Sequence, residues 1–198
     1  SNTKAHFEHT GPEIWQQTKG KVDALVSVVG TAGTIAGNSR YLSGQNPDLK
    51  TWLVDPDGSG LYSYLKDGKF ASHGNSFTEG IGIMRCVENF RQAKIDYAIT
   101  LPDQDLVDMS RKILDLDGIL LGSSSALNVA GAMYAAAKMG PGNTIVTFCC
   151  DLAERSYTKL YNWSFLKDKN IIENNETLAE KFERSKAEPV ENVVKVVK

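Results

Sequence analysis

The residues with the clearest chemical potential form a short turn rich in glycine and threonine. The turn follows an apolar run that ends at Val29 and precedes a helix-like stretch; it consists of Gly30, Thr31, Ala32, Gly33 and Thr34. Such a turn directs several backbone N–H groups toward one point, in front of the positive end of a helix dipole. The pattern predicts a site for a phosphate dianion. The alternative is a close strand–helix turn that binds no ligand. The sequence matches neither a Walker A loop nor a G-x-G-x-x-G loop.

Three consecutive serines, at positions 123–125, form the second candidate site. They follow another apolar run and precede an alanine-rich stretch. One of the hydroxyls could cap the helix, or one could face a ligand beyond the carboxyl end of the strand. Three serines exceed what a cap requires. The segment lacks a G-x-S-x-G turn and a histidine placed as its base, so a serine nucleophile is not expected.

Two further segments follow predicted strands or turns and carry weaker signals. Gly80, Ile81 and Gly82 belong to a flexible polar turn, which could bind a ligand or be only a loop. Asp151 and Arg155 follow the last apolar run and could contribute to a site or form only an ion pair.

These segments require a scaffold of alternating strands and helices. Near-continuous apolar runs predict strands buried on both faces, which is typical of parallel sheets; they span residues 23–29, 52–55, 96–101, 119–121 and 144–150. Candidate helices lie between or beside them, at 12–18, 34–42, 59–65, 103–116 and 125–139. The order predicts an α/β fold, a mostly parallel, doubly wound sheet with helices on both faces.

Composition excludes several classes of protein. The 198 residues carry 22 Lys+Arg and 24 Asp+Glu, a net charge of −2, so nucleic acid is not an expected partner. No apolar run approaches the roughly 18 residues of a membrane span. Three cysteines without metal spacing predict buried thiols in a reducing compartment, cytoplasmic or mitochondrial, and no metal site.

The composition changes near residue 170. We expect residues 1–172 to form the folded portion and residues 173–198 a polar tail, partly disordered or folded as one charged helix. Its low apolar content predicts little contact with the core.

The ordered motifs resemble the cysteine synthase and cystathionine β-synthase family, pyridoxal-phosphate enzymes with the tryptophan synthase β-subunit fold. The segment Gly122-Ser-Ser-Ser-Ala-Leu-Asn128 is most similar to the fungal cysteine-synthase-like branch. The motifs are His9-Thr-Gly-Pro-Glu-Ile-Trp15, the 30–34 turn, Glu79-Gly-Ile-Gly82, Gly122-Ser-Ser-Ser125 and Cys150-Asp-x-x-Glu-Arg155. The resemblance implies that residues 30–34 hold the phosphate of pyridoxal 5'-phosphate and that Ser124 bonds its pyridine nitrogen. It places Gly80, Ile81 and Gly82 beside the substrate.

Three departures from the family pattern stand out. Ala32 replaces the middle glycine of the usual Gly-Thr-Gly-Gly-Thr loop, and a positive φ there would cost about 1 kcal/mol or more. The usual Asp-Ser-Gly-x-Arg-Tyr segment reads Asp151-Leu-Ala-Glu-Arg155-Ser156. The Schiff-base lysine motif is absent and is expected N-terminal to Ser1, so the chain resembles the C-terminal half of the enzyme and contains no catalytic residue.

The implied activity is β-replacement in cysteine biosynthesis, from O-acetylserine and sulfide to cysteine. It would require the missing N-terminal half, in the same or another chain, and the complete protein would be a homodimer. Within the family, cystathionine synthesis and serine or threonine deamination are alternatives. Outside enzymes, the alternative is a catalytically silent binding or interaction module.

Overall fold

The structure is a computed structural model that describes residues 2–171, 178–187 and 193–196. Within these ranges the strands form one sheet in the order β4-β1-β2-β3-β5. Neighbouring strands are parallel except β5, which runs antiparallel to β3. This arrangement confirms the predicted fold class. The strands are β1 Ala24–Val28, β2 Lys50–Pro56, β3 Tyr97–Leu101, β4 Ile145–Val146 and β5 Val193–Lys195.

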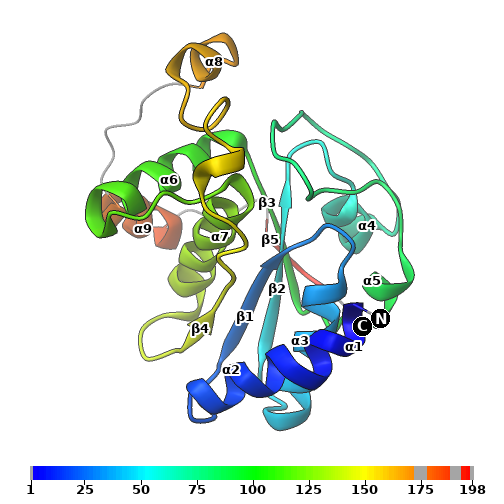
Figure 1. The fold of residues 1–198 in the computed structure, drawn as a ribbon. Coiled ribbons are helices and arrows are strands. Elements are labelled where there is room, and N and C mark those ends of the chain that lie inside the picture. Colours follow the sequence, from blue (N-terminus) through cyan, green and yellow to red (C-terminus); the bar gives the residue numbers. More distant parts are fainter. Residues whose placement is uncertain (1, 172–177, 188–192, 197–198) are drawn as a thin grey trace.

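Helices lie on both sides of the sheet (Figure 1). On one side are α1 Asn2–Ala5, the π-helical turn η1 His6–Thr10, α2 Gly11–Gln17, α3 Gly33–Gln45, α4 Leu61–Asp67 and α5 Glu88–Gln92. On the other are α6 Asp103–Asp117, α7 Ser123–Met139 and α9 Leu178–Ala187. The 3-10 turn η2 Ala153–Arg155 and helix α8 Trp163–Asp168 follow β4 in the chain.

Strands β1, β2 and β3 are mostly apolar because both of their faces are covered. In β2, Trp52 and Val54 pack in the cluster that contains the buried residues of α6 and α7. Leu53, which lies between them, packs on the opposite face with Leu61 of α4. This alternation is the side-chain geometry of a strand, and it explains why a periodicity of two is absent from the sequence.

Some predicted elements differ from the observed ones. Residues 119–121 do not form a strand; Leu121 makes only an isolated antiparallel bridge with Leu152, and Ile119 is exposed. The strand predicted over residues 144–150 is limited to β4, and beyond it Phe148 and Asp151 form hydrogen bonds with side chains of α7. Cys149 and Cys150 are consequently exposed, so the prediction of buried thiols is wrong for both.

One buried amide fixes α7 against the sheet. Asn128 is fully buried, and its Oδ1 accepts a hydrogen bond of 2.7 Å from the Val28 N–H at the end of β1. Its Nδ2 donates to the Phe148 carbonyl at 2.8 Å. The same side chain therefore joins a helix, a strand end and the segment after β4.

The described part of the tail contacts the folded core. Residues 178–187 form a helix, which was one of the two expected states, but Lys181 is only 4% exposed. Its ammonium pairs with the carboxylates of Asp105 and Asp108 on α6. Strand β5 pairs with β3. The division of the chain near residue 172 stays a prediction, but α9 and β5 are not solvated appendages, because charge pairing and edge hydrogen bonds replace apolar burial.

We predict that Lys181→Met lowers stability, because it leaves two buried carboxylates without their cation. Removing one partner of a buried ion pair costs up to about 3–5 kcal/mol. In a chain of this size about 3 kcal/mol corresponds to roughly 6–12 °C in melting temperature. Lys186→Met is the matched control, since Lys186 pairs with Glu183 at the surface. Equal melting temperatures for the two variants would contradict the docking of α9.

Candidate functional site

The predicted phosphate turn lies between β1 and α3, as the sequence indicates. Helix α3 begins at Gly33 and has no side-chain cap. The first-turn N–H groups of a helix lack intrahelical acceptors, and at a helix of 13 residues they lie at the positive end of the dipole. Thr31 is exposed and Thr34 is half-buried. The donors in this turn suit a phosphate group.

Ala32 adopts the left-handed conformation, with φ 64° and ψ 5°. The sequence left the sign of this angle open, and the positive value is the costly one for a residue with a Cβ. Ala32 is 4% exposed and packs in the apolar cluster on this face of the sheet. Burial of the methyl group offsets part of the strain.

Close packing surrounds the turn. A Cβ on Gly33 would collide with the Asn2 side chain, and one on Gly30 would collide with the Gly80 carbonyl. Asn89 of α5 donates to the Thr31 carbonyl at 3.0 Å. Both glycines are thus required by neighbouring protein atoms, whether or not a ligand binds.

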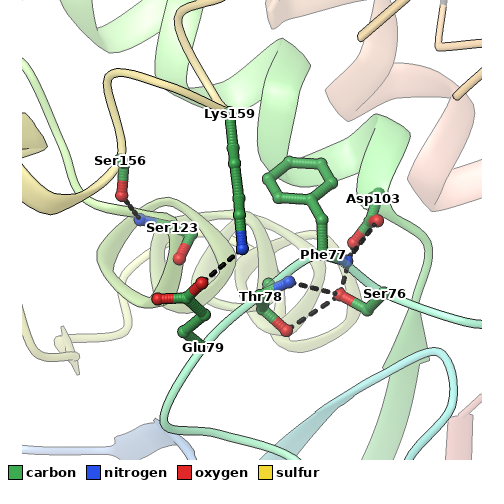
Figure 2. A network of polar contacts seen from close by, with 8 residues as sticks. All are labelled: Ser76, Phe77, Thr78, Glu79, Asp103, Ser123, Ser156 and Lys159. Atoms are coloured by element: carbon green, nitrogen blue, oxygen red, sulfur yellow. Dashed lines mark hydrogen bonds and ion pairs between the residues drawn. The ribbon is translucent and has the colours of Figure 1, made fainter. Parts of the chain in front are cut away.

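The three serines at the start of α7 have different environments. Ser125 is buried; its hydroxyl donates to the Asp151 carbonyl at 2.8 Å and accepts from the Asp151 N–H at 3.1 Å. Ser124 is half-buried, and its hydroxyl donates to the Asp151 carboxylate at 3.3 Å. The Ser123 N–H donates to the buried Ser156 hydroxyl at 3.3 Å (Figure 2). Two of the serines therefore bind the 151 loop to α7.

A hollow of about 130 Å³ lies in front of α7. Ser123 lines it, whereas Ser124 does not; the other lining residues are Phe77, Glu79, Gly80, Asp151, Arg155, Ser156 and Lys159. Figure 2 shows the Glu79 carboxylate paired with the Lys159 ammonium beside it. Nothing in the sequence distinguishes Ser123 from its neighbours or marks Lys159, because only the helix register separates adjacent serines and only the fold brings Lys159 to the hollow.

The loop of residues 80–82 connects the hollow with the phosphate turn. Gly80 lines the hollow and lies against Gly30. The Gly82 N–H donates to the Val29 carbonyl at 2.9 Å. Ile81 packs against the core cluster. The structure thus brings together the 30–34 turn, the 80–82 loop and the start of α7.

The alternative for Asp151 and Arg155, an ion pair between them, is not observed. Arg155 lines the hollow, and no described residue forms a hydrogen bond or ion pair with its guanidinium. Among the described ranges no group of histidine, cysteine and acidic residues could hold a metal ion. In the same ranges no helix is long and apolar enough to cross a membrane.

Comparison with known proteins identifies the class of protein that carries this arrangement. A family of pyridoxal-phosphate dependent enzymes matches residues 1–151. The chain belongs to this family, whose members use pyridoxal phosphate as their cofactor. The resemblance drawn from the motifs is confirmed.

The similar curated proteins include cysteine synthases. The cysteine synthase of Dictyostelium discoideum is 44% identical over 181 residues, which cover 86% of this chain and 48% of that protein. Cysteine synthase 2 of Schizosaccharomyces pombe is 44% identical over 185 residues, 87% of this chain and 47% of that protein. The chain spans about half the length of the curated relatives it matches.

A similar solved structure is the O-acetylserine dependent cystathionine beta-synthase from Helicobacter pylori. It has a TM-score of 0.72 and 30% sequence identity, and the match covers 80% of this chain and 49% of that one. The fold of the chain is therefore that of a pyridoxal-phosphate enzyme.

We predict that Thr31→Asp abolishes phosphate binding but preserves the fold. A carboxylate in front of α3 repels a dianion, while it interacts favourably with the helix dipole. The measurement is a ³¹P NMR titration with inorganic phosphate, together with the melting temperature. Thr31→Ser is the matched control. Gly33→Asp is less informative because any Cβ there meets Asn2. Unchanged phosphate affinity in Thr31→Asp would exclude the turn as the site.

Proposed function

We propose that the complete protein catalyses a pyridoxal-phosphate dependent β-replacement that makes cysteine from O-acetylserine and sulfide. The observation that carries the proposal is the convergence of the 30–34 turn, the 80–82 loop and the start of α7 at one end of the sheet. The names of the similar proteins, cysteine synthases, support the same reaction. When bound, the cofactor supplies an electron sink for elimination and addition at the substrate's β carbon.

The residues of this chain would bind and orient the cofactor. Backbone N–H groups at the start of α3, with the Thr31 and Thr34 hydroxyls, would hold the phosphate. The Thr34 hydroxyl is 3.2 Å from His6 Nε2, so its orientation is set from outside the turn. Gly80 and Gly82 have positive φ values of 76° and 78°, which glycine adopts without strain. A Cβ on Gly82 would meet Pro56 and Ser59, whereas Gly80 faces open space, so the absence of a side chain at Gly80 would leave room for the substrate.

The hydroxyl of a serine at the start of α7 would form a hydrogen bond with the pyridine nitrogen of the cofactor. A neutral hydroxyl, unlike a carboxylate, does not hold a proton on that nitrogen, which favours elimination over transamination. The resemblance assigns this role to Ser124. The geometry favours Ser123 instead, because Ser123 lines the hollow and the Ser124 hydroxyl is directed to Asp151.

Two of the three alternatives have an observation in their favour. Cystathionine synthesis is favoured by the name of the similar Helicobacter pylori enzyme. A catalytically silent module is favoured by the setting of Lys159, which among the described lysines alone lines the hollow and is engaged by Glu79. Serine or threonine deamination uses the same cofactor but has no separate observation in its favour.

The proposal requires further components. The imine-forming lysine and the rest of the substrate site would come from a second polypeptide segment, in the same or another chain, and the complete protein would be a homodimer. The described cysteines are unpaired, which agrees with a reducing compartment, cytoplasmic or mitochondrial.

We predict that Ser123→Ala weakens pyridoxal 5'-phosphate binding and leaves inorganic phosphate binding unchanged. Loss of one hydrogen bond of about 0.5–1.5 kcal/mol weakens affinity roughly 2–12-fold. The measurement is a ³¹P NMR titration with each ligand. Ser124→Ala is the matched control and should bind both ligands as the wild type does. If only Ser124→Ala weakened pyridoxal 5'-phosphate binding, Ser124 and not Ser123 would be the residue that bonds the pyridine nitrogen.

We predict that residues 1–198 alone do not make cysteine and form no stoichiometric imine with the cofactor. A reactive lysine requires a desolvated setting or another activating group, whereas the Lys159 side chain is 36% exposed and paired with Glu79. The test is borohydride reduction with pyridoxal 5'-phosphate, followed by peptide mapping. Lys159→Met is the control. One lysine labelled to full occupancy in the wild type would show that the chain contains its own imine-forming residue.

A further inference from the structure

The loop of residues 76–82, which closes one side of the hollow, is anchored firmly at its first end. The Asp103 carboxylate, at the start of α6, accepts from the Ser76 hydroxyl at 2.5 Å and from the Phe77 N–H at 2.9 Å (Figure 2). The Ser76 hydroxyl also lies 2.8 Å from that of Thr78. This end of the loop is thus joined to the helix that follows β3.

The second end is anchored on Val29, the residue before the phosphate turn, and on Ser59. The Gly82 N–H donates to the Val29 carbonyl, and the next residue, Ile83, donates its N–H to the Ser59 hydroxyl at 3.0 Å. Between the two anchors lie Glu79 and Gly80, both of which line the hollow.

The tip of the loop is joined across the hollow by one ion pair. The Lys159 ammonium donates to the Glu79 carboxylate (Figure 2). This hydrogen bond, followed by the charge of Lys159, holds the pKa of Glu79 below its usual value. Lys159 lies in a turn in which its N–H donates to the Ser156 carbonyl, and the Ser156 hydroxyl is bonded to the start of α7. The ion pair therefore connects the loop tip to α7.

We propose that Lys159 is a positioning residue whose ion pair with Glu79 holds the 76–82 loop closed over the hollow. Ligand entry and exit would then require this pair to break, and the hydrogen bonds at the Asp103 and Val29 anchors to open transiently with it. The identity of the ligand rests on the proposed function, but the closure of the loop does not.

The ion pair that holds the loop closed is a weak interaction. Glu79 is 71% exposed and Lys159 is 36% exposed at the side chain, and exposed ion pairs are modest and screened by salt. A contact of this strength changes the open population only a few-fold. It suits a loop that must open in each cycle of ligand exchange.

The test is amide hydrogen exchange in the full chain, read at Phe77, Thr78 and Gly82. We expect Lys159→Met to raise the exchange rates of these amides about 2–5-fold, with other amides unchanged. Glu79→Gln should have the same effect, and the double variant should exceed neither, because all three remove one interaction. Lys21→Met, at an exposed lysine outside the loop, is the matched control.

Two further results are expected. Exchanging the charges, with Glu79→Lys and Lys159→Glu together, should restore slow exchange. Raising sodium chloride from 0.05 to 0.5 M should speed loop exchange in the wild type and not in the Glu79→Gln, Lys159→Met double variant.

Unchanged loop exchange in Lys159→Met, or a rise spread over the whole chain, would overturn the proposal. In a separate arm, pyridoxal 5'-phosphate should associate and dissociate about 2–5-fold faster with Lys159→Met, at a similar dissociation constant. If pyridoxal 5'-phosphate does not bind even the wild-type chain, the assignment of a cofactor site to these residues fails, while the exchange result still decides the role of Lys159.

Discussion

The site depends on the two hydrogen bonds of one buried amide. Asn128 Oδ1 accepts from the last residue of β1, and Asn128 Nδ2 donates to the segment that follows β4. The phosphate turn starts directly after that strand, and the serines lie one turn earlier on the same helix. An aspartate would lack the donor and a leucine would lack both groups, each leaving a buried backbone group without its partner. No other residue type of this size satisfies both positions.

Packing, rather than ligand contact, accounts for much of the turn's sequence. Gly33 accommodates Asn2, and Gly30 accommodates the Gly80 carbonyl. Helix α1 and the 80–82 loop can therefore approach the turn only because residues 30 and 33 are glycines and have no Cβ. Ala32 keeps a left-handed backbone in spite of its methyl group, which is buried in the adjacent apolar cluster. Packing thus constrains at least three of the five residues proposed to hold the phosphate, Gly30, Ala32 and Gly33.

The sequence predicted those features that depend on local apolar pattern. Strands β1 and β3 and helices α6 and α7 were expected from apolar runs and helical spacing, and the turn was expected from its glycines. The pattern failed where burial depends on distant residues. Lys181 is buried because α6 supplies two carboxylates 73 and 76 positions earlier in the chain, and charge alone predicted a solvated face. Ser123 could not be separated from Ser124 without the geometry of α7.

The C-terminal strand changes what the sheet presents to other molecules. The edge of β3 would otherwise display unpaired N–H and C=O groups beside Tyr97 and Ile99, and such an edge is a template for pairing with another chain. Strand β5 occupies it in antiparallel register, with Val193 opposite Ile99 and Lys195 opposite Tyr97. The opposite edge, β4, is only two residues long. Strand β5 thus covers the edge of β3, and the charged side chain of Lys195 on this outer strand disfavours pairing with a further strand.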